Sequence, residues 1–234
     1  MSAPAGLPPG RPVDVGRRAL VVMAKAPREG HSKTRLAGAL PTGEVVRLSQ
    51  CMLLDTLDLA RSLDGVHVAV MCPSEDVAAL AGMIPGAEVV GQDGAGLAQA
   101  LACAFRRFGG AGFSRIVAID ADSPHLPASA IEQAFARLSR SDLVVGPTDD
   151  GGYYLVGVTH PHGGLFDAAA MGTASAFKAL VARTGELGLI AAVLPEQYDV
   201  DLPDDLSRLA RELAGDPDRA PRTAAVLAGA RGRA

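Results

Sequence analysis

The sequence Ala19-Leu-Val-Val-Met23 continues directly into Ala24-Lys-Ala-Pro-Arg-Glu-Gly-His-Ser-Lys-Thr-Arg-Leu36, and this stretch decides the fold. The first part is apolar throughout, which is typical of a strand covered on both faces. The second part is a polar loop with basic side chains at Lys25, Arg28, Lys33 and Arg35. In open α/β sheets, ligands bind at loops that follow strands. The sequence therefore predicts a buried first strand followed by a ligand-binding loop.

The basic loop has two interpretations. Clustered cations and backbone N–H groups suit a polyphosphate, whereas Lys and Arg are more often simply exposed to solvent. The loop matches neither the Gly-x-x-x-x-Gly-Lys-Ser/Thr phosphate-loop pattern nor Gly-x-Gly-x-x-Gly. His31 lies in the same loop and is most simply an exposed side chain. Spacing alone leaves phosphate binding and a solvated loop equally open.

Composition describes an ordinary globular protein and excludes several classes. The chain has 234 residues, 48% hydrophobic and 21% charged, with a net charge of −4 and no Trp. This charge leaves no basic face for nucleic acid, and no apolar run approaches the roughly 18 residues of a membrane span. The N-terminus lacks a signal-peptide pattern. We expect a cytoplasmic protein whose three cysteines, Cys51, Cys72 and Cys103, are reduced core residues.

Hydrophobic periodicity predicts strands alternating with helices. The strands are expected at 19–23, 66–72, 87–90, 115–120, 142–146, 153–158 and 189–194. The helices are expected at 42–63, with Thr42 as N-cap, and at 75–81, 97–108, 130–138 and 174–184, with a last helix ending near 214. This alternation predicts a single α/β domain with a mostly parallel sheet covered by helices on both faces. We expect the domain to span 18–214, between flexible tails at 1–17 and 215–234.

Two pairs of carboxylates follow strands. Asp120 and Asp122 close a buried strand and, two positions apart, share one face of it. Such a pair could hold Mg²⁺, which takes one or two carboxylates together with substrate phosphates; alternatively, one of the two caps the next turn. Asp199 and Asp201 repeat the arrangement before the last helix, where capping is a stronger alternative.

The turn Gly146-Pro-Thr-Asp-Asp-Gly-Gly-Tyr-Tyr154 places two glycines after two aspartates. A hairpin or bulge would explain Gly151 and Gly152 structurally. Equally, the backbone could approach a substrate closely there while Asp149 or Asp150 binds hydroxyl groups.

These motifs, taken in order, resemble a known family. They are Lys25 with Ser32-Lys-Thr-Arg-Leu-Ala37, Met52-Leu-Leu-Asp-Thr-Leu57, Asp122-Ser-Pro-His-Leu-Pro127, Gly146–Leu155 and Asp199-Val-Asp-Leu-Pro-Asp-Asp-Leu206. Together they resemble a bacterial family of nucleotide-diphospho-sugar transferase-like proteins of the GT-A type. A more distant similarity is to guanylyltransferases that activate phospholactate or phosphoenolpyruvate.

The resemblance implies a nucleotide bound over the carboxyl ends of the first strands, with Mg²⁺ or Mn²⁺. Carried onto this chain, the nucleotide would be bound by Ala24, Lys25, Lys33, Thr34 and Arg35. The metal would be held by Asp122 and Asp201, with Asp120 beside them, and the acceptor would be bound by Asp149, Asp150, Gly151, Gly152 and Tyr153. One departure is Met171-Gly-Thr173, where the family often has Trp-Ser-Thr. An aromatic platform for a sugar acceptor would therefore be missing.

We expect a metal-dependent transferase with Asp122, Lys33 and Asp150 as its catalytic residues. The favoured reaction is glycosyl transfer from a nucleotide-diphospho-sugar to a small acceptor, because the Gly-Gly-Tyr-Tyr turn matches that family. The alternative is a nucleotidyltransferase that joins a nucleoside monophosphate to a phosphorylated small acid and releases pyrophosphate. The three cations Lys25, Lys33 and Arg35 suit this alternative. A non-catalytic nucleotide sensor is disfavoured by the two intact carboxylate pairs.

Overall fold

A seven-stranded sheet forms the centre of the protein, as a computed structural model shows for residues 16–30, 33–36, 38–166 and 175–231. The strands are β1 Arg18–Met23, β2 Val66–Cys72, β3 Glu88–Gly91, β4 Arg115–Asp120, β5 Leu143–Pro147, β6 Tyr153–Val158 and β7 Ala191–Val193. Their order in the sheet is β3-β2-β1-β4-β6-β5-β7. All neighbours are parallel except β6, which runs antiparallel to β4 and β5. β1 therefore lies between β2 and β4, and their carboxyl ends share one edge.

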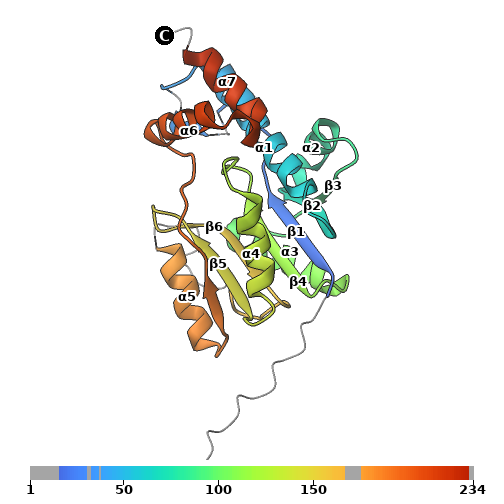
Figure 1. Ribbon diagram of the computed structural model, residues 1–234. Coiled ribbons are helices and arrows are strands. Elements are labelled where there is room, and N and C mark those ends of the chain that lie inside the picture. The colour runs from blue at the N-terminus through green and yellow to red at the C-terminus, as the bar shows by residue number, and fades with distance from the viewer. Residues whose placement is uncertain (1–15, 31–32, 37, 167–174, 232–234) are drawn as a thin grey trace, which may run out of the picture.

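Helices cover both faces of this sheet (Figure 1). They are α1 Thr42–Arg61, α2 Val77–Met83, α3 Leu97–Gly110, α4 Ala128–Arg137, α5 Ala176–Glu186, α6 Pro203–Gly215 and α7 Pro221–Arg231, with short 3-10 helices η1 Thr34–Leu36, η2 Ser74–Asp76 and η3 Pro217–Arg219. α1, α2 and α4 pack on one face, and α3 and α5 pack on the other. Within the described ranges, no helix combines the length and apolar character needed to cross a bilayer.

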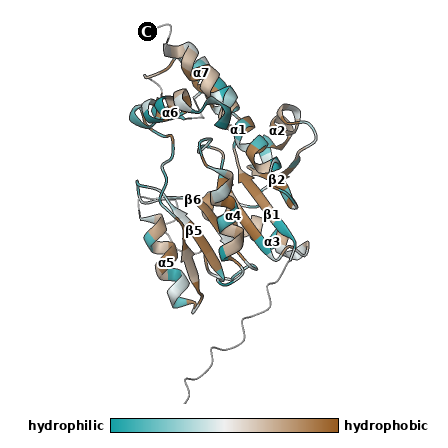
Figure 2. Ribbon diagram, in the orientation of Figure 1, coloured by the Kyte–Doolittle hydropathy of each residue, from teal (hydrophilic) through white to brown (hydrophobic). Residues whose placement is uncertain are grey.

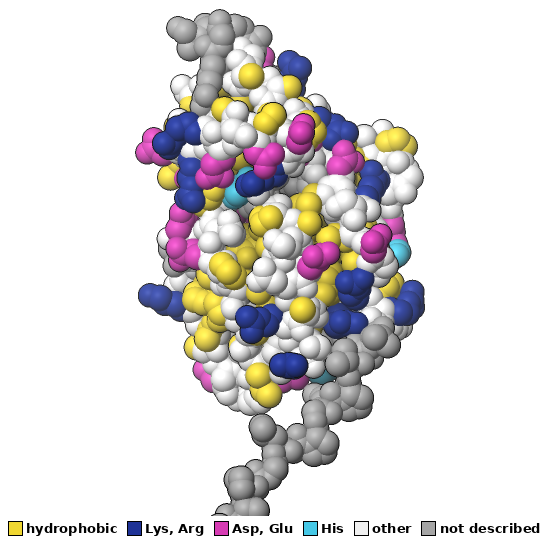
Figure 3. Space-filling view, viewed as in Figure 1, with side chains coloured by type: hydrophobic (Ala, Val, Ile, Leu, Met, Phe, Trp, Pro, Cys, Tyr) yellow, Lys and Arg dark blue, Asp and Glu magenta, His cyan; other side chains and the backbone are white. Residues whose placement is uncertain are grey.

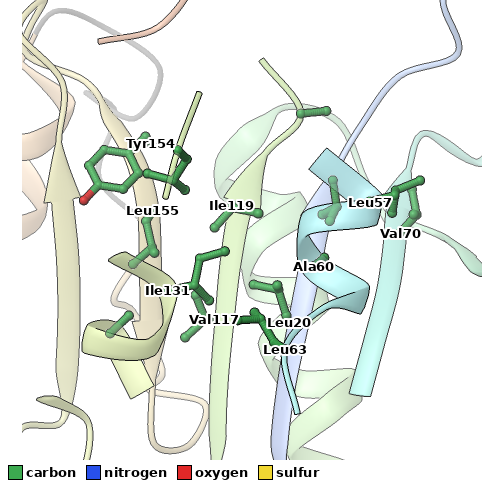
Figure 4. Close-up of a cluster of buried hydrophobic side chains, with 14 of the residues drawn as sticks. Leu20, Leu57, Ala60, Leu63, Val70, Val117, Ile119, Ile131, Tyr154 and Leu155 are labelled. Carbon is green, nitrogen blue, oxygen red and sulfur yellow. The ribbon is translucent and has the colours of Figure 1, made fainter. Parts of the chain in front are cut away.

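The apolar strands explain the two-sided core. In β1, Leu20 and Val22 point to the face covered by α1 and α4, whereas Ala19 and Val21 point to the face covered by α3, and all four are fully buried. Successive side chains of a strand alternate between faces, so both faces can be covered only if every position is apolar. Figure 4 shows the first face, where Leu57 of α1 and Ile131 of α4 approach the strands. In Figure 2 the strands are accordingly hydrophobic, while α6 contains many hydrophilic residues.

A third cluster joins the two C-terminal helices to the beginning of α1. It contains Leu48 and Met52 of α1, Leu209 of α6 and Leu227 of α7, all buried. Figure 1 shows α6 and α7 beside α1, beyond the carboxyl ends of β1, β2 and β4. The sheet itself is thus extended by a helical layer at the edge where the loops lie.

The expected fold class is confirmed, and the strands at 66–72, 115–120 and 153–158 match residue for residue. Two expectations are wrong. Thr42 is the first residue of α1 and Pro41 is its N-cap, without a side-chain hydrogen bond. The frayed tail expected from residue 215 instead contains η3 and α7. Residues 1–15 of the tail expected at 1–17, together with His31, Ser32, Ala37 and the Met171–Thr173 segment, lie outside the described residues.

α7 forms because other parts of the chain hold it. Asp55 of α1 is buried, and its carboxylate accepts the backbone N–H groups of Arg222 and Thr223, with donor–acceptor distances of 3.3 and 2.8 Å. A carboxylate at a helix N-terminus satisfies free N–H groups and complements the helix dipole. The Arg222 guanidinium also contacts Asp55 and Asp58, at 3.0 and 2.6 Å. Tertiary contacts of this kind are invisible in the local composition of residues 215–234.

Candidate functional site

A cavity of about 800 Å³ opens at the carboxyl ends of β1, β2 and β4. The loop after β1 supplies one wall, the segments after β2 and β3 supply another, and the Asp120–Asp122 segment after β4 supplies a third. Asp201, from the segment before α6, completes the lining. All five residues expected to bind nucleotide line this cavity: Ala24, Lys25, Lys33, Thr34 and Arg35. The loop thus lies where the order of the strands predicts a ligand.

The beginning of this loop is fixed by Asp76, at the end of η2. Its buried carboxylate accepts the backbone N–H of Ala26 at 2.9 Å and pairs with the guanidinium of Arg28 at 2.6 Å. Arg28 is therefore held on the neighbouring segment, while Lys25, Lys33 and Arg35 remain on the cavity wall. No motif of the sequence singles out Asp76. Its position in a polar segment directly after the strand at 66–72 was the available signal.

Lys33 bridges two carboxylates. Its Nζ lies 2.9 Å from Asp122 Oδ2 and 2.9 Å from Asp201 Oδ1, and its side chain is only 6% exposed. Burial alone lowers the pKa of Lys33, but the carboxylates of Asp122 and Asp201 outweigh burial and raise it above its ordinary value. Arg35 also contacts Asp201, at 3.4 Å. The structure thus joins the expected nucleotide loop to two of the three expected metal ligands.

The other two aspartates of the pairs have different surroundings. Asp120 Oδ1 accepts the backbone N–H of Asp122 at 2.8 Å, while Oδ2 is buried with no hydrogen-bond partner among the described residues. Burial, followed by the charges of Asp199 and Asp122, raises the pKa of Asp120 well above its usual range. Burial also raises the pKa of Asp199 to about 6, although the hydrogen bond that the Ser123 hydroxyl donates to it at 3.1 Å lowers this pKa.

These groups fit a hard divalent cation. Asp122 and Asp201 come from segments far apart in the chain, yet their carboxylates converge on one positively charged atom. In the described part of the chain, no group of three or more His, Cys, Asp or Glu is arranged to hold a metal ion. A site with only two protein carboxylates suits Mg²⁺ or Mn²⁺, because substrate phosphates and water complete the coordination.

The Gly146–Tyr154 turn lies outside the cavity lining and is stabilised internally. Asp150 Oδ1 accepts the Thr148 hydroxyl at 2.6 Å and the Gly152 N–H at 2.9 Å, as in an Asx turn. Gly151 has a φ of 89°, in the region that favours glycine. Asp149 pairs with Arg208 of α6 at 3.4 Å. The structure therefore gives both aspartates structural partners, and it places the turn against α6.

Gly146 and Tyr154 also have a packing role. A Cβ at Gly146 would come within 2.3 Å of the Tyr154 ring, so only glycine leaves room for it. The Tyr154 hydroxyl donates to the Pro195 carbonyl at 3.2 Å. This contact ties β6 to the segment that leads to Asp199 and Asp201. Burial raises the pKa values of both Tyr153 and Tyr154, the latter to about 12.

Three side chains that no sequence motif singles out form a stack. The His125 and Tyr198 rings lie 4.0 Å apart with an angle of 19° between them, and the Arg208 guanidinium covers the Tyr198 ring at 3.7 Å. This stack joins the segment after β4 to α6. Figure 3 shows acidic and basic side chains mixed along the band where the C-terminal helices meet the rest of the molecule.

Comparison with known proteins places the chain among bacterial proteins of this fold. Residues 56–173 match the family described as "Uncharacterized protein conserved in bacteria (DUF2064)". No curated protein matches the chain. A proposed nucleotide-diphospho-sugar transferase from Desulfovibrio desulfuricans G20 has a similar structure, with a TM-score of 0.86 and 24% identity over 93% of this chain and 96% of that one.

Two further structures are less similar. Rv0371c from Mycobacterium tuberculosis H37Rv, in complex with manganese, gives a TM-score of 0.51 and 21% identity over 82% of this chain and 97% of that one. A nucleotidyl transferase from Methanothermobacter gives a TM-score of 0.52 and 16% identity over 86% of this chain and 99% of that one. At these identities the likeness establishes the fold.

Proposed function

The chain belongs to the bacterial family DUF2064, and from this premise, joined to its fold, we propose that it is a metal-dependent cytoplasmic transferase that uses a nucleotide substrate. The preferred reaction is glycosyl transfer from a nucleotide-diphospho-sugar to a small acceptor. One observation carries the proposal: Lys33, Asp122 and Asp201 converge on the wall of a cavity of about 800 Å³ that is also lined by Lys25 and Arg35.

The cations and the carboxylates of the cavity wall have different roles in this proposal. Lys25, Lys33 and Arg35 bind the diphosphate through charge-assisted hydrogen bonds, with Ala24 and Thr34 beside them. Asp122 and Asp201 hold Mg²⁺ or Mn²⁺, while Asp120 fixes the backbone of Asp122. The bound cation supplies positive charge near the leaving diphosphate. The manganese complex of Rv0371c and the name of the Desulfovibrio protein support this assignment.

The acceptor is assigned to the turn at Asp149–Tyr153. The Asp150 carboxylate offers hydrogen-bond acceptors to substrate hydroxyl groups, and Gly151 and Gly152 let the backbone approach those hydroxyl groups closely. Asp149 and Tyr153 flank these three residues. The internal hydrogen bonds of Asp150 hold its carboxylate in one orientation, which preorganises it. Acidic side chains at this turn favour a neutral, hydroxyl-rich acceptor over a phosphorylated one.

Nucleotidyl transfer is the second candidate. Three cations line the cavity, more than a diphosphate with a bound divalent cation needs, and they would suit a triphosphate. Solved structures with this fold include a nucleotidyl transferase and a CMP:2-keto-3-deoxy-manno-octonic acid synthetase complexed with CTP. In this reaction an acceptor phosphate attacks the α-phosphorus in line, and pyrophosphate leaves.

The products distinguish the two reactions. The full chain is incubated with Mn²⁺ or Mg²⁺ and panels of nucleotide sugars or nucleoside triphosphates, with neutral sugars or phosphorylated small acids as acceptors. Release of a nucleoside diphosphate from a nucleotide sugar is the expected result. Pyrophosphate release from a triphosphate, with no diphosphate from any nucleotide sugar, would reject glycosyl transfer in favour of nucleotidyl transfer.

A further inference from the structure

The Lys33 ammonium occupies the position between Asp122 and Asp201 that the proposed function assigns to a divalent cation. We propose that Lys33 is the internal counter-ion of this carboxylate pair in the nucleotide-free protein, and that it excludes divalent cations until a nucleotide phosphate draws the ammonium away. Metal and nucleotide would then bind as a coupled pair rather than independently. This inference rests on the proposed function and adds an order of binding to it.

The geometry makes Lys33 and a metal ion mutually exclusive. Nζ lies 2.9 Å from one oxygen of each carboxylate, so it uses the oxygens that face the shared space. Mg²⁺ needs carboxylate oxygens at about 2.0–2.1 Å, and two positive charges in the same space would repel each other strongly. The Lys33 side chain is 6% exposed, which limits screening by water. A divalent cation can therefore enter only if the ammonium leaves.

The carboxylates in turn resist losing Lys33 alone. Asp122 and Asp201 are both charged groups facing one small space, and removing the cation between them would leave two like charges together. Arg35 contacts the outer oxygen of Asp201 at 3.4 Å but is 69% exposed, so it compensates only partly. An exchange of the ammonium for a divalent cation leaves a positive charge between the two carboxylates both before and after the exchange.

The cavity gives the displaced ammonium a new partner. Lys33 lines the same wall as Lys25 and Arg35, where the proposed diphosphate binds. The residue has a φ of 47°, in the left-handed region that non-glycine residues rarely adopt. Such a backbone persists when its surroundings hold it, and Lys33 is held at both ends: its carbonyl accepts the Leu36 N–H at 2.9 Å and its ammonium contacts two carboxylates. A phosphate bound at this wall would give the Lys33 ammonium a new partner in place of the two carboxylates.

Thermodynamic linkage makes the coupling measurable. If nucleotide raises the affinity for the cation, the cation raises the affinity for nucleotide by the same factor. The contribution of Lys33 is isolated by measuring Mn²⁺ binding without nucleotide, where Lys33 acts only as a competitor.

The test titrates Mn²⁺ into the full chain without nucleotide and follows free Mn²⁺ by electron paramagnetic resonance. Lys33→Met keeps the length of the side chain and removes its charge. We expect it to bind Mn²⁺ about tenfold more tightly than the unmodified protein, or more, within the usual range of couplings between sites. Lys25→Met is the matched control, because it removes one charge from the same wall without removing the bridge. It should leave Mn²⁺ affinity within about threefold.

Thermal unfolding gives a second measurement. Without Mn²⁺, Lys33→Met should unfold at a lower temperature than the unmodified protein. Added Mn²⁺ should raise the unfolding temperature of Lys33→Met by more than it raises that of the unmodified protein. Unchanged Mn²⁺ affinity in Lys33→Met, with binding abolished in Asp122→Asn, would overturn this inference and leave the metal assignment standing. No Mn²⁺ binding by any variant, with or without nucleotide, would overturn the inference together with the metal assignment.

Discussion

Four aspartates surround Lys33, and their environments divide them into two kinds. Asp122 and Asp201 are half-exposed and contact the ammonium directly. Asp120 and Asp199 are more enclosed, and burial raises both pKa values. Ligands of a hard cation must be charged and accessible, so the exposed pair is better suited to bind metal. The assignment of Asp122 and Asp201 as ligands remains a prediction, and Asp120 is better regarded as a support for Asp122.

Replacing either exposed carboxylate should remove metal binding without unfolding the protein. Asp122→Asn and Asp201→Asn keep the side-chain shape and lose the charge. Each should weaken Mn²⁺ binding in the presence of nucleotide by more than about 100-fold, the upper end for loss of an outer-shell partner. Asp149→Asn is the control, since Asp149 contacts Arg208 instead of Lys33. Retention of Mn²⁺ binding in both variants would remove this pair from the site.

Because of His125, we expect the protein to lose stability in mild acid. Its two ring nitrogens are buried without a hydrogen-bond partner among the described residues, and burial lowers its pKa to about 4. Between about pH 6.5 and 4 the unfolded chain therefore binds a proton at His125 that the folded protein does not. The contribution of the neutral ring to the free energy of unfolding is fully present above this range. It falls as the pH drops through the range, by about 3 kcal/mol in total.

The measurement compares the protein with His125→Phe, which preserves the stack on Tyr198. Urea unfolding across pH 7 to 4 should show a smaller acid loss in His125→Phe. The difference between the two proteins isolates His125, because Asp199 is present in both and contributes to both pH profiles. Asp199 acts in the opposite direction to His125. Its pKa is raised to about 6, so the folded state gains relative stability as the pH falls below that value. Parallel pH profiles for the two proteins would contradict the assignment.

At the scale of elements, the loop after β1 depends on η2. Asp76→Ala removes the acceptor for the Ala26 N–H and the partner of Arg28. We expect unfolding free energy to fall by about 1–3 kcal/mol, the cost of an unsatisfied buried donor. Nucleotide affinity should fall as well, because the loop would have to be ordered on binding. Calorimetric titration measures the second effect. Asp64→Ala, at an exposed position, should change neither quantity.

α7 depends on one side chain of α1. Asp55→Ala removes the carboxylate that caps α7 and contacts Arg222. The expected loss of unfolding free energy is about 2–4 kcal/mol, because Asp55 is buried and its partners would be left unsatisfied. Asp58 pairs with the same guanidinium but is 54% exposed. Asp58→Ala should therefore cost less than about 1 kcal/mol in the same urea titration. Equal losses in both variants would mean that the cap contributes nothing.

The elements differ in how well the sequence predicts them. Central strands such as β1 and β4 are found because burial on both faces requires continuous apolar runs. The edge strand β7 is shorter than expected, since only Ala191–Val193 pairs with β5. α7 is missed because its Ala-rich sequence has no apolar stripe, and its stability comes from Asp55 and from buried Val226 and Leu227.

At the scale of the whole molecule, the sequence indicates most of the cavity wall but not how its parts meet. The loop after β1 and the Asp120–Asp122 segment could be placed together, since both follow strands of a parallel sheet. The partnership of Lys33 with Asp201 could not, because it depends on how the C-terminal helical layer packs on α1. The sequence marked Asp199 and Asp201 as a second carboxylate pair, but only the family resemblance chose Asp201 as a partner of Asp122 in holding a metal. The expected acceptor turn lies outside the cavity lining, which spacing could not reveal.

Ligand binding should stabilise the molecule as a unit, because the cavity draws on segments from both ends of the described chain. A nucleotide at about 100 times its Kd adds about 2.7 kcal/mol to the unfolding free energy. In thermal unfolding, nucleotide with Mn²⁺ should raise the midpoint more than the sum of the two separate effects. A merely additive shift would mean that the two ligands bind independently.

The contact between Lys33 and Asp201 joins residues 168 positions apart, which has a consequence for a chain still on the ribosome. When the loop after β1 and Asp122 have both emerged, Lys33 has only half of its carboxylate partners. Asp201, α6 and the Asp55 cap of α7 become available only after the whole sheet has been synthesised. A nascent chain thus has the cations of the cavity wall long before Lys33 has both of its carboxylate partners. The order of translation therefore postpones assembly of the cavity wall until α6 and α7 have docked on α1.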